Sequence, residues 1–197
     1  MAVKNATMSA EVEETLEDLL HQIDQKAEIV NHQIILLPPA GGLDGHASGE
    51  IFFSLRKYSK QLRNGLAFGD NTAFMVNLPH RKSFSPCAGF YVGAVPSGFE
   101  FFPGAPVFAV EVRNQFHYGP RADRERAAKR IDYFAAGTLV VWDVDLLSDE
   151  IIKVHRAGEK EPTVYSRGQV AEAEPAVPGW TMPVDDLYPR GYKIEVE

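Results

Sequence analysis

The chain has 197 residues, of which 45% are hydrophobic and 24% are charged. These fractions are typical of a globular protein with one sizeable core, and they exclude a collagen-like repeat, a coiled coil and wholesale disorder. The formal net charge of −7 argues against a generic basic nucleic-acid coat protein, because phosphate binding depends on Lys and Arg.

The N-terminal sequence and the cysteine content indicate the compartment. The stretch MAVKNATMSAEVEETLEDLL has neither the basic start nor the apolar block of a signal peptide. No segment reaches about 18 consecutive apolar residues, the length that predicts a membrane span. Cys87 is the single cysteine, which excludes an intramolecular disulfide and a cysteine-rich zinc site. We therefore expect a cytoplasmic protein without a membrane partner.

The apolar pattern changes its period along the chain and predicts helices and strands in turn. Residues 1–8 are expected to form a loose tail and residues 9–197 a single domain. The expected helices are 9–23, 48–62 and 122–136, the last ended by Gly137. The expected strands are 28–37 (or a hairpin), 74–78, 87–92, 107–112, 139–144, 151–155 and 163–165. This order predicts a mixed α/β (α+β) fold, with a central sheet flanked by helices.

Two features refine this prediction. The order strand, helix, strand from 107 to 144 indicates a crossover between parallel strands. The Gly-rich stretch 40–49 lacks the Gly-Lys-Ser/Thr ending of a phosphate-binding P-loop, so we expect a flexible loop there.

Glu111 is the most informative residue, because a carboxylate inside an apolar strand is costly unless it is paired, protonated or bound to metal. Strand side chains alternate, so Glu111 and Arg113 point to one face while Val110 and Val112 point to the other. Two interpretations stay open. Glu111 is either half of an ion pair at a strand end or a metal-binding acid followed by a cation, as phosphodiester cleavage requires.

Periodicity argues against a functional role for Lys129. In the helix expected over 122–136, the apolar stripe consists of Ala127, Ala128, Ile131, Phe134 and Ala135. Lys129 lies nearly opposite that stripe, and spacing alone predicts a solvated lysine. By the same reasoning Glu50, on the helix expected over 48–62, is an ordinary surface acid.

The arrangement from about Glu28 to Tyr188 resembles the Uma-two family of bacterial restriction endonucleases, a branch of the PD-(D/E)XK nuclease superfamily. The landmarks that carry the resemblance are PPAGG (38–42), EIFFSL (50–55), SPCAGFYV (85–92), APVFAVEVRN (105–114), KRIDYFAAGTLVVWDVD (129–145) and PGWTMPVDDLY (178–188). The resemblance implies a restriction-endonuclease-like core with an active site at the edge of its sheet. It also implies DNA as substrate and Mg²⁺ or Mn²⁺ as cofactor.

The resemblance assigns roles to single residues. Glu111 matches the family's metal-binding glutamate, and Glu50 matches an acid on the helix that borders the site. Arg113 stands where the superfamily's lysine usually follows the acid, whereas Lys129 matches a lysine in the following helix. Strand parity favours Arg113 as the catalytic cation and the family pattern favours Lys129, so both are kept.

Cys87 departs from the family pattern, since the family's Ser-Pro-Asp is Ser85-Pro86-Cys87 here. An aspartate expected to hold metal is thus replaced by a thiol, which is soft and mostly protonated at neutral pH. We list Cys87 with Glu111 and Glu50 as candidate metal ligands and predict weak or absent Mg²⁺-dependent cleavage. The alternatives are an inactive nuclease-fold protein that binds DNA or a protein partner and, more distantly, a cysteine hydrolase using Cys87.

The net charge is unevenly distributed. Residues 29–142 contain 12 basic and 8 acidic side chains, whereas both ends of the chain are acidic. The segment with the candidate site is therefore basic enough to face DNA. The expected phosphate contacts are Arg121, Arg124, Arg126 and Arg130. A homodimer is also expected, because cutting two strands suits a two-fold pair.

Overall fold

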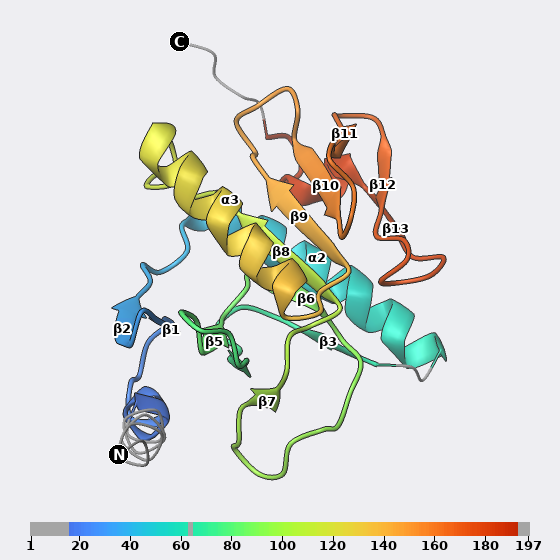
Figure 1. Cartoon of the computed structure of the whole chain (residues 1–197). Helices are drawn as coiled ribbons and strands as arrows, with labels where there is room; N and C mark the ends of the chain where they lie inside the picture. The colour runs from blue at the N-terminus through green and yellow to red at the C-terminus, as the bar shows by residue number, and fades with distance from the viewer. Residues whose placement is uncertain (1–15, 63–64, 193–197) are drawn as a thin grey trace, which may run out of the picture.

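The computed structural model describes residues 16–62 and 65–192. Its centre is a six-stranded sheet in the order β11-β10-β9-β8-β6-β3 (Figure 1). The strands are β3 (Leu66–Phe68), β6 (Ala88–Tyr91), β8 (Phe108–Val112), β9 (Val140–Val144), β10 (Ile152–Arg156) and β11 (Thr163–Tyr165). The pair β8–β9 is parallel and all other neighbours in this sheet are antiparallel. The predicted mixed sheet with a parallel crossover is confirmed.

Two helices cover opposite faces of the sheet: α3 (Pro120–Ala135) crosses one face and α2 (Gly42–Leu62) crosses the other (Figure 1). Alternation along β8 determines what each helix meets. Phe108, Val110 and Val112 pack into the main core with α2, whereas Ala109 packs with Tyr133 of α3. Glu111 follows the parity of Ala109, and its register partner on β9 is Asp143. The carboxylate of Glu111 is therefore directed to the side of the sheet that α3 covers.

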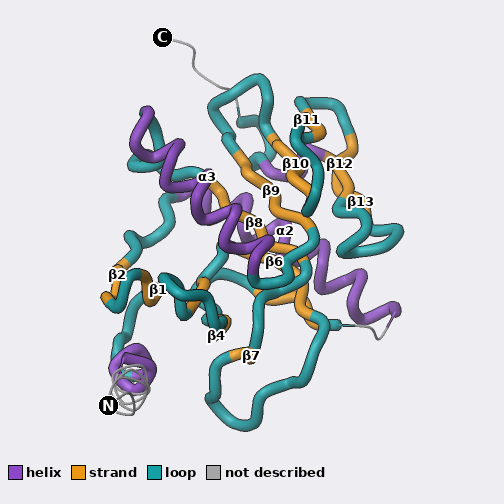
Figure 2. The backbone as a smooth tube through the Cα atoms, viewed as in Figure 1, coloured by secondary structure: helices purple, strands orange, loops and turns teal. Residues whose placement is uncertain are grey.

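Shorter elements surround this core (Figure 2). They are the hairpin β1 (Ala27–Val30) and β2 (Gln33–Leu36), the small sheet β4 (Phe74–Met75), β5 (Ser83–Phe84) and β7 (Phe102–Pro103), the pair β12 (Val170–Glu172) and β13 (Thr181–Pro183), and the 3-10 helix η1 (Val184–Leu187). The hairpin turns at Asn31 and His32, both with positive φ (51° and 58°), the pattern of a tight two-residue hairpin turn. This turn sets the hairpin beside β5, where the amide of Ile29 donates to Ser83 Oγ at 2.8 Å.

The expectation of a flexible loop over 40–49 is wrong, because α2 begins at Gly42. Ala47, Ile51 and Leu55 are all fully buried against the sheet. Burial of that face offsets the cost of about 1 kcal/mol for each glycine inside a helix. Composition alone did not predict the extra turns, because the stabilising contacts are tertiary.

The other predicted helices and strands agree with the structure within a few residues, apart from the N-terminal region, whereas β3, β5, β7, β12, β13 and η1 have no counterpart in the sequence predictions. Of the helix expected over 9–23, residues 16–21 are helical and residues 22–23 are not, while residues 9–15, like the tail 1–8, lie outside the described residues. Helix α3 ends before Gly137, whose φ of 103° is a conformation that glycine adopts without strain. Within the described ranges, no helix is long and apolar enough to cross a membrane.

Candidate active site

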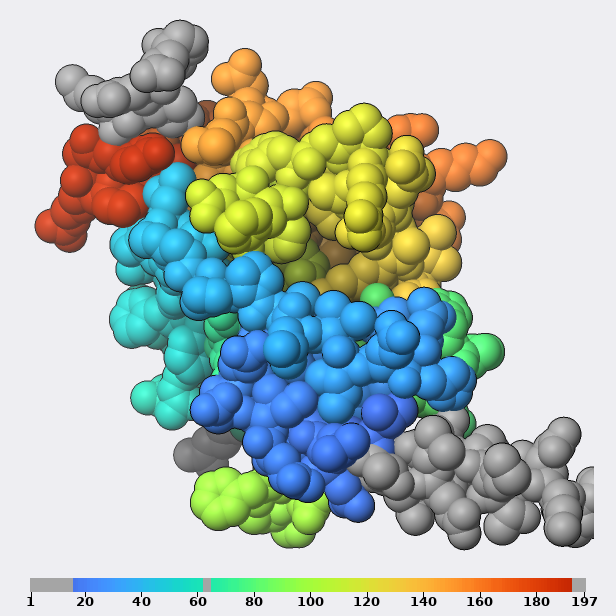
Figure 3. All heavy atoms as spheres, turned by 90° about the vertical axis from the view of Figure 1, so that its left-hand side faces the viewer, coloured from blue at the N-terminus to red at the C-terminus, as the bar shows by residue number. Residues whose placement is uncertain are grey.

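A pocket of about 580 Å³ opens beside the end of β8. Its walls come from the β1–β2 hairpin, the first turn of α2, the loop after β8 and the N-terminal half of α3. In Figure 3 it is the hollow between the blue segments, which are the hairpin and the start of α2, and the yellow-green segment that leads into α3. Five residues predicted from the sequence line it: Cys87, Glu111, Arg121, Arg126 and Lys129.

A second pocket of about 610 Å³ lies on the far side of the hairpin, beside Ile29, Met75 and Ala136. It contains none of the residues predicted for the site. We therefore place the candidate site in the pocket beside the end of β8, which is called the pocket below.

Glu111 and Lys129 meet in this pocket. Lys129 Nζ lies 2.8 Å from Glu111 Oε1, and Tyr133, one helical turn further along α3, donates its hydroxyl hydrogen to the same oxygen at 2.7 Å. Burial and the nearby Glu111 carboxylate raise the pKa of the Tyr133 hydroxyl well above its ordinary value, so it stays protonated and donates.

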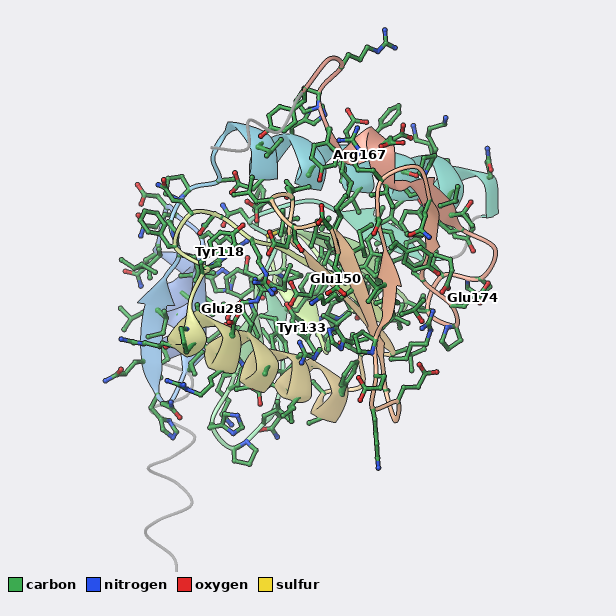
Figure 4. The ribbon with its side chains drawn as sticks, turned by 90° about the horizontal axis from the view of Figure 1, so that it is seen from above. Glu28, Tyr118, Tyr133, Glu150, Arg167 and Glu174 are labelled. Atoms are coloured by element: carbon green, nitrogen blue, oxygen red, sulfur yellow. The ribbon has the colours of Figure 1, made fainter. Side chains whose placement is uncertain are left out.

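Glu28, which sequence analysis did not single out, holds Lys129 from the other side. Glu28 Oε1 lies 2.7 Å from Lys129 Nζ and accepts a hydrogen bond from the Ser85 amide at 2.9 Å. Its second oxygen pairs with Arg81 at 2.6 Å. Figure 4 labels Tyr133, on α3, and Glu28, which lies beside this helix. Glu28 is 4% exposed, so these partners supply the compensation that a buried carboxylate needs.

The neighbouring charges determine the protonation states of Glu28 and Lys129. Burial alone would raise the pKa of Glu28, but the charges of Lys129 and Arg81 lower it below its ordinary value. Burial likewise opposes the charge on Lys129, whose pKa is nevertheless raised by Glu111 and Glu28. An ammonium between two carboxylates is therefore the stable arrangement of the pocket.

The predicted apolar stripe of α3 is wrong. Ile131, assigned to the buried stripe, is 66% exposed, whereas Asp132 and Tyr133 are buried. The side chain of Lys129, predicted to be solvated, is only 16% exposed. The inner face of α3 is lined by polar and charged groups that find partners on the sheet and the hairpin. A hydrophobic pattern cannot identify such a face.

Cys87 lies on the hairpin side of the same pocket. Lys26 Nζ is 3.8 Å from Cys87 Sγ and 2.5 Å from Asp70 Oδ1. Burial raises the pKa of the Cys87 thiol and the charge of Lys26 only partly opposes this. The thiol is therefore mostly protonated at neutral pH and unsuited to act as a nucleophile, and sulfur is in any case a soft ligand that a hard ion such as Mg²⁺ disfavours.

Arg113 is engaged elsewhere. Its guanidinium lies 3.3 Å from Asp143, 3.4 Å from Asp145 and 3.4 Å from Asp123, and Arg126 also pairs with Asp143. Burial and the charge of Arg113 lower the pKa of Arg126 to about 10, which leaves it charged at neutral pH. Of the two cations predicted as catalytic candidates, Lys129 contacts Glu111. Arg113 instead pairs with Asp123, Asp143 and Asp145.

The remaining predicted residues are divided between the pocket and the surface. Glu50 is half-buried on α2 and does not line the pocket, whereas Asp44, in the first turn of α2, does. Arg121 and Arg124 are exposed, with Arg121 at the pocket and paired to Glu125 on the next turn. Arg130 is a half-buried residue of α3 that does not line the pocket.

The residues present do not fit a divalent metal ion in this arrangement. Across residues 16–62 and 65–192, no group of three or more His, Cys, Asp or Glu side chains is placed to hold one. The two oxygen donors near Cys87 already have cationic partners, Lys129 on Glu111 and Lys26 on Asp70. The thiol between them is a poor ligand for a hard ion.

The fold resembles a solved nuclease-like structure. A crystal structure of a putative nuclease belonging to DUF820 from Anabaena variabilis matches with a TM-score of 0.69 and 15% sequence identity. The match covers 87% of this chain and 96% of that chain, so the fold class of the two proteins is shared. This confirms the fold class expected from the sequence.

The family is established by a second comparison. The model of the Uma2 family, described as putative restriction endonuclease, matches residues 13–185. The chain belongs to the Uma2 family, and the resemblance noted from its sequence motifs is confirmed. Among curated proteins, none matches this chain.

Proposed function

We propose that this chain acts on DNA as an endonuclease of reduced activity, which binds the phosphodiester backbone at the pocket and hydrolyses it slowly. The contact of 2.8 Å between Lys129 Nζ and Glu111 Oε1 carries the proposal. It puts a fixed cation beside a carboxylate in a pocket whose rim includes Arg121. The family description, restriction endonuclease, supports the same substrate class.

The chemistry assigned to these residues follows from their charges. Hydrolysis places additional negative charge on the phosphate oxygens, and a preorganised ammonium such as Lys129 stabilises it. Glu111 accepts a proton from, and orients, the attacking water. Glu28 and Tyr133 are positioning residues, because they contact Lys129 and Glu111 rather than the phosphate.

Cys87 is the reason for expecting reduced activity. The metal ligands predicted from the family pattern are Glu50, Glu111 and Cys87, with Mg²⁺ or Mn²⁺ as the ion. A protonated thiol cannot replace a carboxylate oxygen for a hard cation. Retention of Mg²⁺ at this pocket is consequently expected to be poor.

A second candidate function is DNA binding without cleavage. The contact of Lys26 with Asp70 and Cys87 favours it, since this ammonium already neutralises the acid that would otherwise attract a metal. The two candidates agree on the DNA-facing surface and differ in cleavage.

Nicking of supercoiled plasmid tests the proposal. The unmodified chain, Cys87→Asp and Glu111→Gln are incubated with Mg²⁺ and, separately, with Mn²⁺. We expect slow nicking by the unmodified chain, faster nicking by Cys87→Asp and none by Glu111→Gln. Lys153→Met serves as the matched control, because Lys153 lies on β10 outside the pocket, where it pairs with Glu150.

Rapid Mg²⁺-dependent cleavage by the unmodified chain would overturn the claim of reduced activity. Nicking by Glu111→Gln at the rate of the unmodified chain would overturn the assignment of the pocket. Complete absence of nicking, with DNA binding intact, would establish the second candidate. The homodimer remains a prediction, which light scattering of the intact chain tests.

A further inference from the structure

Lys26 is a largely buried cation that lines the pocket on the hairpin side. It immediately precedes β1, and its side chain is 13% exposed. Its ammonium donates to Asp70 Oδ1 at 2.5 Å and reaches Cys87 Sγ at 3.8 Å. Three chain segments that are distant in sequence thus meet at one nitrogen atom.

The Lys26 ammonium neutralises negative charge on the acidic side chains around it. Asp70, Cys87 and Glu111 line the same pocket as Lys26, and Asp70 pairs with the Lys26 ammonium at 2.5 Å. Glu111 also has Lys129 on one of its oxygens. Each of the two carboxylates nearest Cys87 therefore has a lysine of its own, and no excess negative charge is left to attract a divalent ion.

We propose that the Lys26 ammonium is the built-in cation of this pocket, occupying the space beside Asp70, Cys87 and Glu111 and excluding a divalent metal ion. This inference rests on the proposed function in one respect, that the pocket is the site that binds the DNA phosphodiester backbone. It predicts that Cys87→Asp and Lys26→Met are needed together before this chain binds a divalent ion tightly.

The size and charge of the Lys26 ammonium and of a divalent metal ion explain why the first excludes the second. A divalent ion needs several oxygen ligands at about 2 to 2.6 Å and cannot share that space with an ammonium. The ammonium is tethered, so it competes without any loss of translational freedom. Replacing Cys87 by Asp alone therefore gives Lys26 another carboxylate partner and only partly opens the site.

Manganese binding to the full chain, without DNA, tests the proposal. Free Mn²⁺ is followed by its electron paramagnetic resonance signal in titrations of the unmodified chain, Cys87→Asp, Lys26→Met and the double variant. We expect no stoichiometric binding by the unmodified chain and weak binding by Cys87→Asp. The double variant is expected to bind one ion at least tenfold more tightly than Cys87→Asp. Lys153→Met in the Cys87→Asp background is the matched control and is expected to add nothing.

Two titration results would overturn the inference: equal affinity of Cys87→Asp and the double variant, or stoichiometric binding by the unmodified chain. Should the double variant fail to fold by circular dichroism, crystals of the unmodified chain soaked in millimolar MnCl₂ decide. We expect no anomalous peak between Asp70 and Glu111, and a peak there contradicts the proposal. Because no DNA is present, these results stand apart from the outcome of the nicking assay.

Discussion

Lys129 Nζ lies 2.8 Å from Glu111 Oε1 and 2.7 Å from Glu28 Oε1, so one ammonium joins the end of β8 to the N-terminal hairpin. Glu28 is the better buried of the two acids, and its other partner is Arg81. The pair of Lys129 and Glu111 depends on this support. The hairpin is consequently part of the site rather than an appendage to it.

Removing the charge of Glu28 is expected to be costly. Glu28→Gln leaves Lys129 and Arg81 buried with reduced compensation, and breaking a buried pair typically costs about 3 kcal/mol or more. Urea denaturation at pH 7 measures the change in the free energy of unfolding. Glu125→Gln is the matched control, because it breaks the exposed pair with Arg121, and an ion pair in contact with water contributes little to stability. Equal losses in the two variants would contradict the role given to Glu28.

Tyr133→Phe isolates the hydrogen bond to Glu111. The phenyl ring preserves the stack on Phe84, whose centroid lies 4.0 Å away, so the variant removes the hydroxyl and little else. We expect a loss of about 1.5 to 3 kcal/mol, the usual range for a hydrogen bond to a charged acceptor. The loss is read from urea midpoints. A stability equal to that of the unmodified chain would show that Glu111 does not need this donor.

His155 provides a pH-dependent contribution to stability. Burial, and then the positive charge of Arg130, lowers its pKa to about 4. Between about pH 6.5, the ordinary pKa in an unfolded chain, and pH 4, the unfolded state binds the proton and the folded state does not. Stability is therefore lost as the pH falls through this window. We expect the decrease in melting temperature from pH 7 to pH 5 to be smaller in His155→Gln.

His32→Asn is the control for the pH experiment. His32 is exposed in the hairpin turn with φ of 58°, a conformation that asparagine tolerates. The control variant is expected to keep the pH dependence of the unmodified chain. An unchanged slope in His155→Gln would contradict the burial of a neutral imidazole at this position.

The Cys87 thiol is expected to react slowly. Because burial raises its pKa, little thiolate is present at pH 7.5, and alkylation by iodoacetamide is expected to be at least tenfold slower than for free cysteine. Mass spectrometry of the folded chain gives the rate, and the chain in urea gives the fully labelled reference. Rapid labelling would revive the cysteine-hydrolase interpretation, which the structure does not otherwise support.

Much of the fold could be predicted from the sequence, because strong local patterns determine it. Periodicity identified the strands around Glu111 and the parallel crossover, and strand parity identified the face to which Glu111 points. The start of α2 was missed, since a glycine-rich segment becomes helical here through the burial of Ala47. That tertiary contact cannot be predicted from the local amino-acid composition.

The site was less predictable for a related reason. Lys129 looked solvated because the inner face of α3 is charged, and only the family pattern indicated its role. Glu28 and Lys26 lie in or beside an ordinary hairpin strand, and their partners Arg81 and Asp70 are far away in sequence. The one available signal for Glu28 was a carboxylate in an apolar strand, the same signal that identified Glu111.

In the proposed function, this acidic chain binds DNA at the pocket through its basic middle segment, residues 29–142. Fluorescence anisotropy of a labelled duplex in EDTA tests it directly, since no cleavage occurs. Arg121 and Arg124 are exposed on α3, whereas Arg56 and Lys60 are exposed on α2 outside the pocket. The double variant Arg121→Ala/Arg124→Ala is expected to bind several-fold more weakly, with a salt dependence reduced by up to about 2 in slope. Arg56→Ala/Lys60→Ala is expected to bind like the unmodified chain, and equal weakening in both pairs, or no DNA binding by the unmodified chain, would contradict the account.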